Sequence, residues 1–136
     1  TGVAFTCRPD LFNAVVCQVP LLDMKRYTKL LAGHSWIAEY GDTEMTEIWE
    51  FWKKWSPYHN VYKNIRYPKI LFTTSTKDDR VHPGHARKMV ARMKDQGHSV
   101  LYYENIEGGH AGAANLKQRA YTSALTYAYL LKQLQP

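Results

Sequence analysis

Three short apolar segments, separated by longer segments of polar or helical character, constrain the fold of this 136-residue chain more than any other feature. They are residues 12–19, 69–76 and 99–105, and they are rich in Val, Ile, Thr and Tyr. Apolar runs of this length are typical of strands buried inside a sheet. Since helical patterns follow them along the chain, we expect parallel strands joined by right-handed crossovers.

The segments between and around these strands show helical signals. Residues 3–8 end in Arg8-Pro9-Asp10, where proline stops a helix, and Gly97 marks the end of a helix after the second strand. Apolar residues at helical spacing predict three further helices, with these inward faces: Met45, Ile48, Trp49, Trp52 and Trp55; Ala86, Met89, Val90 and Met93; Leu116, Ala120, Ala124, Tyr127, Leu131 and Leu134.

This order of elements predicts the fold class. We expect an α/β protein with three layers, α/β/α, built around a short parallel sheet of three core strands. Neither an internal repeat nor a linker divides residues 1–136, so they predict one domain. No apolar run approaches the ~20 residues that a membrane helix needs, and we expect no membrane association.

The net charge of +6 raises the question of a nucleic-acid partner. The densest basic cluster is Arg87, Lys88, Arg92 and Lys94, which we interpret as the solvated face of one helix. Because no nucleic-acid-binding motif accompanies the charge, we predict no nucleic-acid partner. Cys7 and Cys17 match no zinc motif, and we expect two buried thiols in a reducing compartment. The cytoplasm is the expected location, with the periplasm left open.

An acid and a histidine follow the second and third predicted strands. Asp78 and Asp79 come directly after 69–76, and His110 follows 99–105 in a loop with Gly108 and Gly109. The carboxyl ends of neighbouring parallel strands meet at one edge of a sheet, where functional groups gather. Strand–acid followed by strand–histidine is the chain order of the last two members of an α/β-hydrolase triad.

Two alternatives to a triad stay open at this point. The carboxylates of Asp78 and Asp79 could cap the helix that begins near Pro83, and His110 could be an ordinary loop residue. A nucleophile is also missing, because none of the five serines lies in a G-x-S-x-G motif. Ser35, in "AGHSW", is followed by Trp36 and does not come after a strand.

Longer motifs point to a known family. The segments "RPDLFNAVVCQVPLLDM", "GHSWIAEYG", "SPYHNV", "YPKILFTTSTKDDRVHPGHARKM" and "GGHAGA" extend over nearly the whole chain. They resemble the C-terminal part of the catalytic domain of the prolyl oligopeptidase family of serine peptidases. The resemblance implies a partial α/β-hydrolase fold, with the nucleophile elbow and the β-propeller outside residues 1–136.

The resemblance also implies roles for individual residues. Asp78 and His110 match the triad acid and base, and Arg80 matches an arginine that binds a substrate carbonyl. Trp36 matches an indole that stacks on the substrate proline. The remaining pocket positions are Tyr40, Val81 and Leu21. Trp36 and Tyr40 could instead be core aromatics, and Arg80 could be a surface ion-pair partner.

The implied activity is hydrolysis of short peptides after proline through an acyl-enzyme, with no metal and no cofactor. Without its serine, we expect the chain to be inactive alone. The alternative is a non-catalytic α/β module for self-association or partner binding. In either case an unpaired edge of the first strand, or the Trp-rich helix at 45–55, predicts a homodimer or a higher oligomer.

Overall fold

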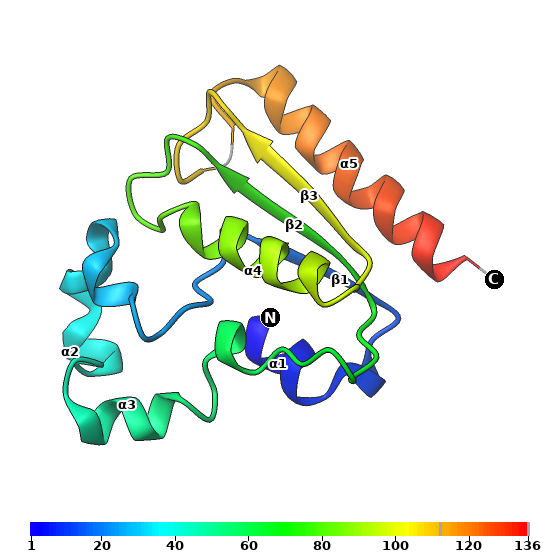
Figure 1. The fold of residues 1–136 in the computed structure, drawn as a ribbon. Helices are drawn as coiled ribbons and strands as arrows, with labels where there is room; N and C mark the ends of the chain where they lie inside the picture. The colour runs from blue at the N-terminus through cyan, green and yellow to red at the C-terminus, as the bar shows by residue number, and fades with distance from the viewer. Residues whose placement is uncertain (112, 136) are drawn as a thin grey trace.

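The computed structural model describes residues 1–111 and 113–135, and Gly112, which belongs to the histidine loop, lies outside them. Its centre is a parallel sheet of three strands, β1 (Ala14–Gln18), β2 (Lys69–Ser75) and β3 (Val100–Asn105), in the order β1-β2-β3 (Figure 1). The register places Cys17 beside Phe72 and Phe72 beside Tyr102. The predicted short parallel sheet is confirmed.

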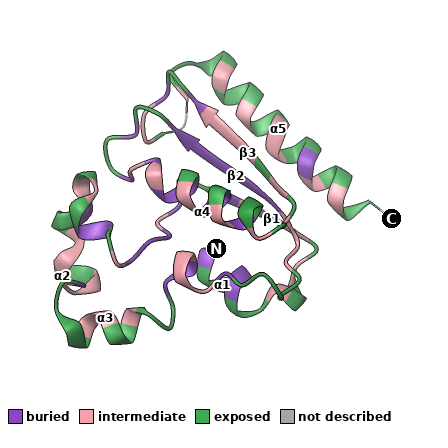
Figure 2. Cartoon of the chain, viewed as in Figure 1, coloured by how far each residue is buried: buried purple, intermediate pink, exposed green. Residues whose placement is uncertain are grey.

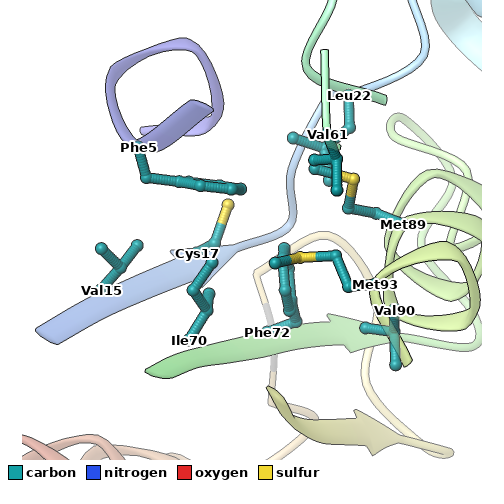
Figure 3. Packing of buried hydrophobic residues seen from close by; sticks show 10 residues of the cluster. All are labelled: Phe5, Val15, Cys17, Leu22, Val61, Ile70, Phe72, Met89, Val90 and Met93. Carbon is teal, nitrogen blue, oxygen red and sulfur yellow. The ribbon is translucent and has the colours of Figure 1, made fainter. Parts of the chain in front are cut away.

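Helices cover both faces of this sheet. On one face, α1 (Gly2–Cys7) and α4 (Gly84–Asp95) enclose the main core, in which Phe5, Phe72 and Met93 pack together (Figure 3). On the other face lies α5 (Leu116–Leu134), which contributes the buried Tyr129. The three-layer prediction is therefore confirmed. The segment between β1 and β2 holds the short elements η2 (Tyr27–Lys29), η3 (Leu31–Trp36), α2 (Ile37–Tyr40), α3 (Thr46–Trp52) and η4 (Pro57–His59).

The three strands differ in burial. In β2, every residue after Lys69 is buried, as expected for a central strand. In β1, only Val15 and Cys17 are buried, because these alternating residues belong to the core on the α1 and α4 side and the opposite face of β1 is only partly covered. The expectation that β1 is buried on both faces is wrong for this reason.

The predicted inward face of α5 is also wrong. Its members Leu116, Tyr127, Leu131 and Leu134 are all more than half exposed, whereas Tyr129 is buried (Figure 2). Positions 127 and 131 lie on nearly the opposite side of the helix from 129. The periodicity correctly identified an apolar face, but the sheet packs against the other side of the helix.

Helix α3 is shorter than the 45–55 segment predicted from the Trp spacing. Trp49 and Trp52 are half-buried, but Met45 and Trp55 are exposed. The indole of Trp52 donates to the carbonyl of Tyr40 over 2.6 Å, which fastens α3 to α2. The predicted apolar face of residues 45–55 is therefore only partly buried.

The basic cluster on α4 lies at the surface as predicted, with Arg87 and Lys94 exposed and Lys88 and Arg92 half-buried. Arg87 pairs with Glu104 on β3, and Lys88 pairs with Asp23. Arg92 stacks on the ring of Tyr58 at 5.1 Å. The solvent-facing side chains of this helix thus also bind neighbouring elements.

The two cysteines are both free, but only one of them is buried. Cys17 lies in the core, where burial raises the pKa of its thiol to about 12. Cys7 is exposed near the end of α1. The expectation of two buried thiols is thus half correct. Over the described part of the chain, no helix has the length and apolar character needed to cross a bilayer.

Candidate active site at the carboxyl edge of the sheet

Asp78 lies directly beyond the carboxyl end of β2, in a tight turn. Its backbone N–H donates to the carbonyl of Ser75 over 3.2 Å. Its Oδ1 accepts from the backbone N–H groups of Arg80 and Val81, both at 2.9 Å. Because the carboxylate is fully buried, these bonds fix its direction.

His110 meets this carboxylate from the loop after β3. Its Nδ1 lies 3.0 Å from both Oδ1 and Oδ2 of Asp78. One third of the His110 side chain is exposed, while the Asp78 side chain is not exposed at all. The predicted pair is therefore in place, with the acid inside and the imidazole at the surface.

This geometry has a definite chemical consequence. An Nδ1–H that donates to a carboxylate leaves Nε2 as the basic nitrogen, free to take a proton from a neighbouring group. The same carboxylate stabilises the imidazolium after the transfer. Asp78 accepts hydrogen bonds from the turn that precedes α4 and also contacts His110. A role at the start of the helix and a role in orienting the imidazole are therefore compatible. Asp79 is exposed and makes no hydrogen bond within the described residues.

Asn105 and Gln118 support the histidine loop, and sequence reasoning missed both. The Oδ1 of Asn105, at the end of β3, accepts from the N–H groups of Glu107 and Gly108 at 3.0 and 3.1 Å. Its Nδ2 donates to Gln118 of α5 over 3.2 Å. Asn after a strand is a turn signal that could have identified it. Gly108 does not adopt a left-handed conformation.

Two hollows lie beside the carboxyl end of β1. His110 lines one of about 220 Å³, and Leu21 lines another of about 220 Å³. Gln18 and Val19 border both, so the end of β1 separates them. Val19 has a φ of +38°, which is rare for a β-branched residue and typical of strained backbone near sites.

Not all of the predicted pocket residues lie at the Asp78–His110 pair. Val81 is adjacent and buried, and Arg80 is exposed on the same turn. Across the described residues, no hydrogen bond, ion pair or ring contact links Trp36 or Tyr40 to the pair.

Tyr40 belongs to an aromatic cluster away from the pair. Its ring packs edge-on against Tyr27 and Trp52, with centroids 6.0 and 5.9 Å apart. Trp36 ends η3 and is half-buried, and Ser35 beside it is exposed.

A Ser–His–Asp grouping also occurs away from the acid–histidine pair, and its Asp23 pairs with Lys88 of α4. The Oγ of Ser56 is 2.9 Å from His59 Nδ1, and His59 Nε2 is 4.0 Å from Asp23. Ser56 is fully buried, however, and its Oγ accepts from the N–H of Met24 over 3.1 Å. A hydroxyl that no substrate can reach cannot act as a nucleophile. We interpret the grouping as structural.

The parallel sheet, the helices on both faces and the acid–histidine pair at its carboxyl edge define a protein of the α/β-hydrolase class. The model of the prolyl oligopeptidase family matches residues 1–136, and the chain belongs to this family. It is 55% identical over 133 residues to an uncharacterised peptidase of Sinorhizobium fredii, and 34% identical over 137 residues to a prolyl endopeptidase of Elizabethkingia miricola.

Solved structures agree with this assignment. One from a study of two prolyl endopeptidases is 40% identical with a TM-score of 0.93. A post-proline cleaving enzyme of Rickettsia typhi is 38% identical, also with a TM-score of 0.93. Each alignment covers 98% of this chain and 20% of the solved chain. The two curated relatives are likewise matched over 98% of this chain but 18% and 19% of their own lengths, so the chain spans about a fifth of them.

Proposed function

We propose that this chain is the C-terminal portion of a prolyl oligopeptidase-type catalytic domain, and that the complete polypeptide cleaves short peptides after proline. The nucleophilic serine and the propeller would lie outside residues 1–136. The observation that supports the proposal most strongly is the contact of His110 Nδ1 with both oxygens of the buried Asp78, at 3.0 Å each. The similarity to prolyl endopeptidases supports the choice of substrate.

The proposed mechanism uses His110 twice. Its Nε2 takes the proton of the serine hydroxyl as the serine oxygen attacks the scissile carbonyl, and it then gives that proton to the leaving amine. Water next attacks the acyl-enzyme, with His110 acting again as base. Throughout, Asp78 holds the ring with Nδ1 protonated and stabilises the imidazolium.

The substrate-side roles remain proposals. Arg80, exposed beside the pair, would bind a peptide carbonyl with its guanidinium. Val81 and Leu21 would form apolar walls of the proline pocket. Trp36 would stack on the proline ring, with Tyr40 behind it. The last two lie on η3 and α2, so they would reach the substrate from the segment between β1 and β2.

The test compares two neighbouring acids in the complete polypeptide. We expect Asp78→Asn to lower kcat on a proline-containing fluorogenic peptide by about 10³–10⁴-fold, because the imidazole loses its orienting carboxylate. Asp79→Asn, a change of the same size at an exposed position, should leave kcat within about threefold. A normal kcat for Asp78→Asn would overturn the assignment of the pair.

The isolated chain provides a second test. We expect neither turnover of the same peptide nor covalent labelling by a serine-directed phosphonate. Labelling of any of its serines would contradict the proposal that the nucleophile lies elsewhere.

A second candidate function is self-association. The edge of β1 that is unpaired among the described strands and the exposed apolar face of α5 favour it, since such surfaces pair with other chains. Exposed Met45, Phe51 and Trp55 make the Trp-rich helix a further candidate surface. For the compartment, the two free thiols support the cytoplasm.

A further inference from the structure

His85 is a buried polar residue that the mechanism does not use. It lies in the first turn of α4 and is 1% exposed. Its Nδ1 accepts from the backbone N–H of Asp23 at 3.1 Å and of Leu22 at 3.4 Å. An imidazole that accepts at Nδ1 carries no proton there. Burial supports this state because it lowers the pKa of His85 to about 4.

A second contact, which we call the second fastening, joins residues 22–23 to α4. The carboxylate of Asp23, only 1% exposed, pairs with Lys88 on α4, one turn after His85. It also pairs with Arg26 over 3.1 Å. Burial alone would raise the pKa of Asp23, but the hydrogen bonds from Lys88 and Arg26 hold it below its usual value. Segment 22–23 is therefore fixed to α4 by its backbone and by a side chain.

Helix α4 is also continuous with the loop of the catalytic acid. It begins at Gly84, three residues after Val81 and four after Arg80. Leu21 immediately precedes the anchored Leu22 and lines a hollow at the end of β1. One helix thus holds Arg80 and Val81 through the chain, and it holds the two residues directly after Leu21 through hydrogen bonds.

We propose that His85 is a positioning residue for the proline pocket: by holding the N–H groups of Leu22 and Asp23, it fixes Leu21 relative to Val81 and Arg80. The inference rests on the proposed function, since it assigns the pocket to those side chains. The Asp23–Lys88 pair reinforces the same spacing. His85 itself does not touch the substrate.

Two substitutions of similar polarity test the role. In His85→Asn, the amide oxygen occupies nearly the position of Nδ1, so the acceptor is kept. In His85→Gln, the longer side chain cannot place its oxygen there. In the complete polypeptide, we expect His85→Gln to lower the ratio of kcat/KM for proline over alanine peptides about tenfold, mainly through KM. His85→Asn should keep the ratio within about threefold.

Hydrogen exchange in the complete polypeptide gives a readout that does not depend on activity. The amides of Leu22 and Asp23 should exchange about tenfold faster in His85→Gln than in His85→Asn, because only the latter keeps their acceptor. Equal exchange in the two variants would overturn the anchoring role. Fast exchange with an unchanged proline-to-alanine ratio would overturn the positioning role.

The outcomes separate this inference from the proposed function. If the unsubstituted complete polypeptide does not cleave after proline, the proposed function fails, and the pocket role of His85 fails with it. If it does cleave and His85→Gln keeps the ratio, only the inference fails.

Lys88→Met covers the case in which His85→Gln does not fold. The Lys88 side chain is 34% exposed, and its loss removes the second fastening together with the contact of Nζ with the Tyr58 ring at 4.5 Å, but leaves the His85 hydrogen bonds in place. We expect the ratio to fall about threefold. An unchanged ratio in this variant would contradict the inference.

Discussion

The carboxylate of Asp78 organises the candidate site with two oxygen atoms. Oδ1 accepts two backbone N–H groups of the turn at 2.9 Å, and both oxygens face His110 Nδ1 at 3.0 Å. A buried acid without such donors would be costly, and here Arg80 and Val81 supply them two and three residues later. The turn that supplies hydrogen bonds to the carboxylate therefore also orients it toward His110. Asp78 therefore cannot be exchanged for another acceptor without loss of either the turn or the orientation.

His85 makes the stability of the chain depend on pH. Its pKa is about 4 in the folded chain and 6.5 when unfolded, so between these values only the unfolded chain binds the proton. The free energy of unfolding should therefore fall as the pH is lowered from 6.5 to 4, by about 3 kcal/mol from this group. Burial also lowers the pKa of His59, which adds in the same direction.

Urea unfolding at a series of pH values, followed by Trp fluorescence, measures this effect. His85→Asn should flatten the dependence above pH 4, because the titrating group is gone. Asp23, Lys88 and His82 are the charged or titratable groups that act on His85. The acid Asp23 has a lowered pKa and contributes only at lower pH, below its ordinary value of 3.8. Equal slopes in the two proteins would contradict the assignment to His85.

At the scale of elements, the hydroxyl of Tyr129 links α5 to β1 and β2, while Gln118 links the start of α5 to β3. The OH of Tyr129 accepts from the N–H of Val15 over 3.2 Å and donates to the carbonyl of Lys69. It thus bridges the starts of β1 and β2. Tyr129→Phe should lower the free energy of unfolding by about 1–3 kcal/mol, because both backbone groups lose their partner.

Tyr127→Phe is the matched control for this prediction. Tyr127 lies on the same helix and is 66% exposed, so its hydroxyl is hydrated. We expect a change within about 0.5 kcal/mol. Urea unfolding of both variants decides the point, and equal losses would show that the hydroxyl of Tyr129 does not fasten the helix.

The strands and the longer helices could be predicted from the sequence, but the side on which α5 packs could not. Short apolar runs predicted β1, β2 and β3, and positions 86, 89, 90 and 93 correctly gave the inner face of α4. For α5, the periodic residues lie on the exposed side. Periodicity shows that an apolar face exists, but it does not show what covers it.

The same distinction applies to the site. Asp78 and His110 follow adjacent strands, so strand order alone predicted that they meet. His85 is one polar residue at a buried helix position, and its partners, Leu22 and Asp23, precede it by more than 60 residues. No local pattern encodes such a contact. The placement of Trp36 likewise depends on how residues 20–60 pack, which no periodic signal describes.

At the scale of the whole molecule, the two faces of the sheet are covered unequally. The face beneath α1 and α4 has a continuous core of buried residues, whereas α5 contributes only one buried residue to the other face (Figures 2 and 3). The outer side of α5 presents Leu131 and Leu134 to solvent, and the neighbouring β1 edge is unpaired among the described strands. Apolar surface of this kind favours association.

We therefore expect the 136-residue chain to form a dimer or a higher oligomer at tens of micromolar, as measured by size-exclusion chromatography with light scattering. Leu131→Glu should shift the mass toward the monomer, because it places a charge in the middle of the apolar face of α5. Lys94→Glu, an exposed change on the opposite layer, should leave the mass unchanged. Phe51→Glu tests the Trp-rich helix in the same assay. A monomer in the unsubstituted chain would contradict self-association. An oligomer that persists in Leu131→Glu but not in Phe51→Glu would assign the contact to α3.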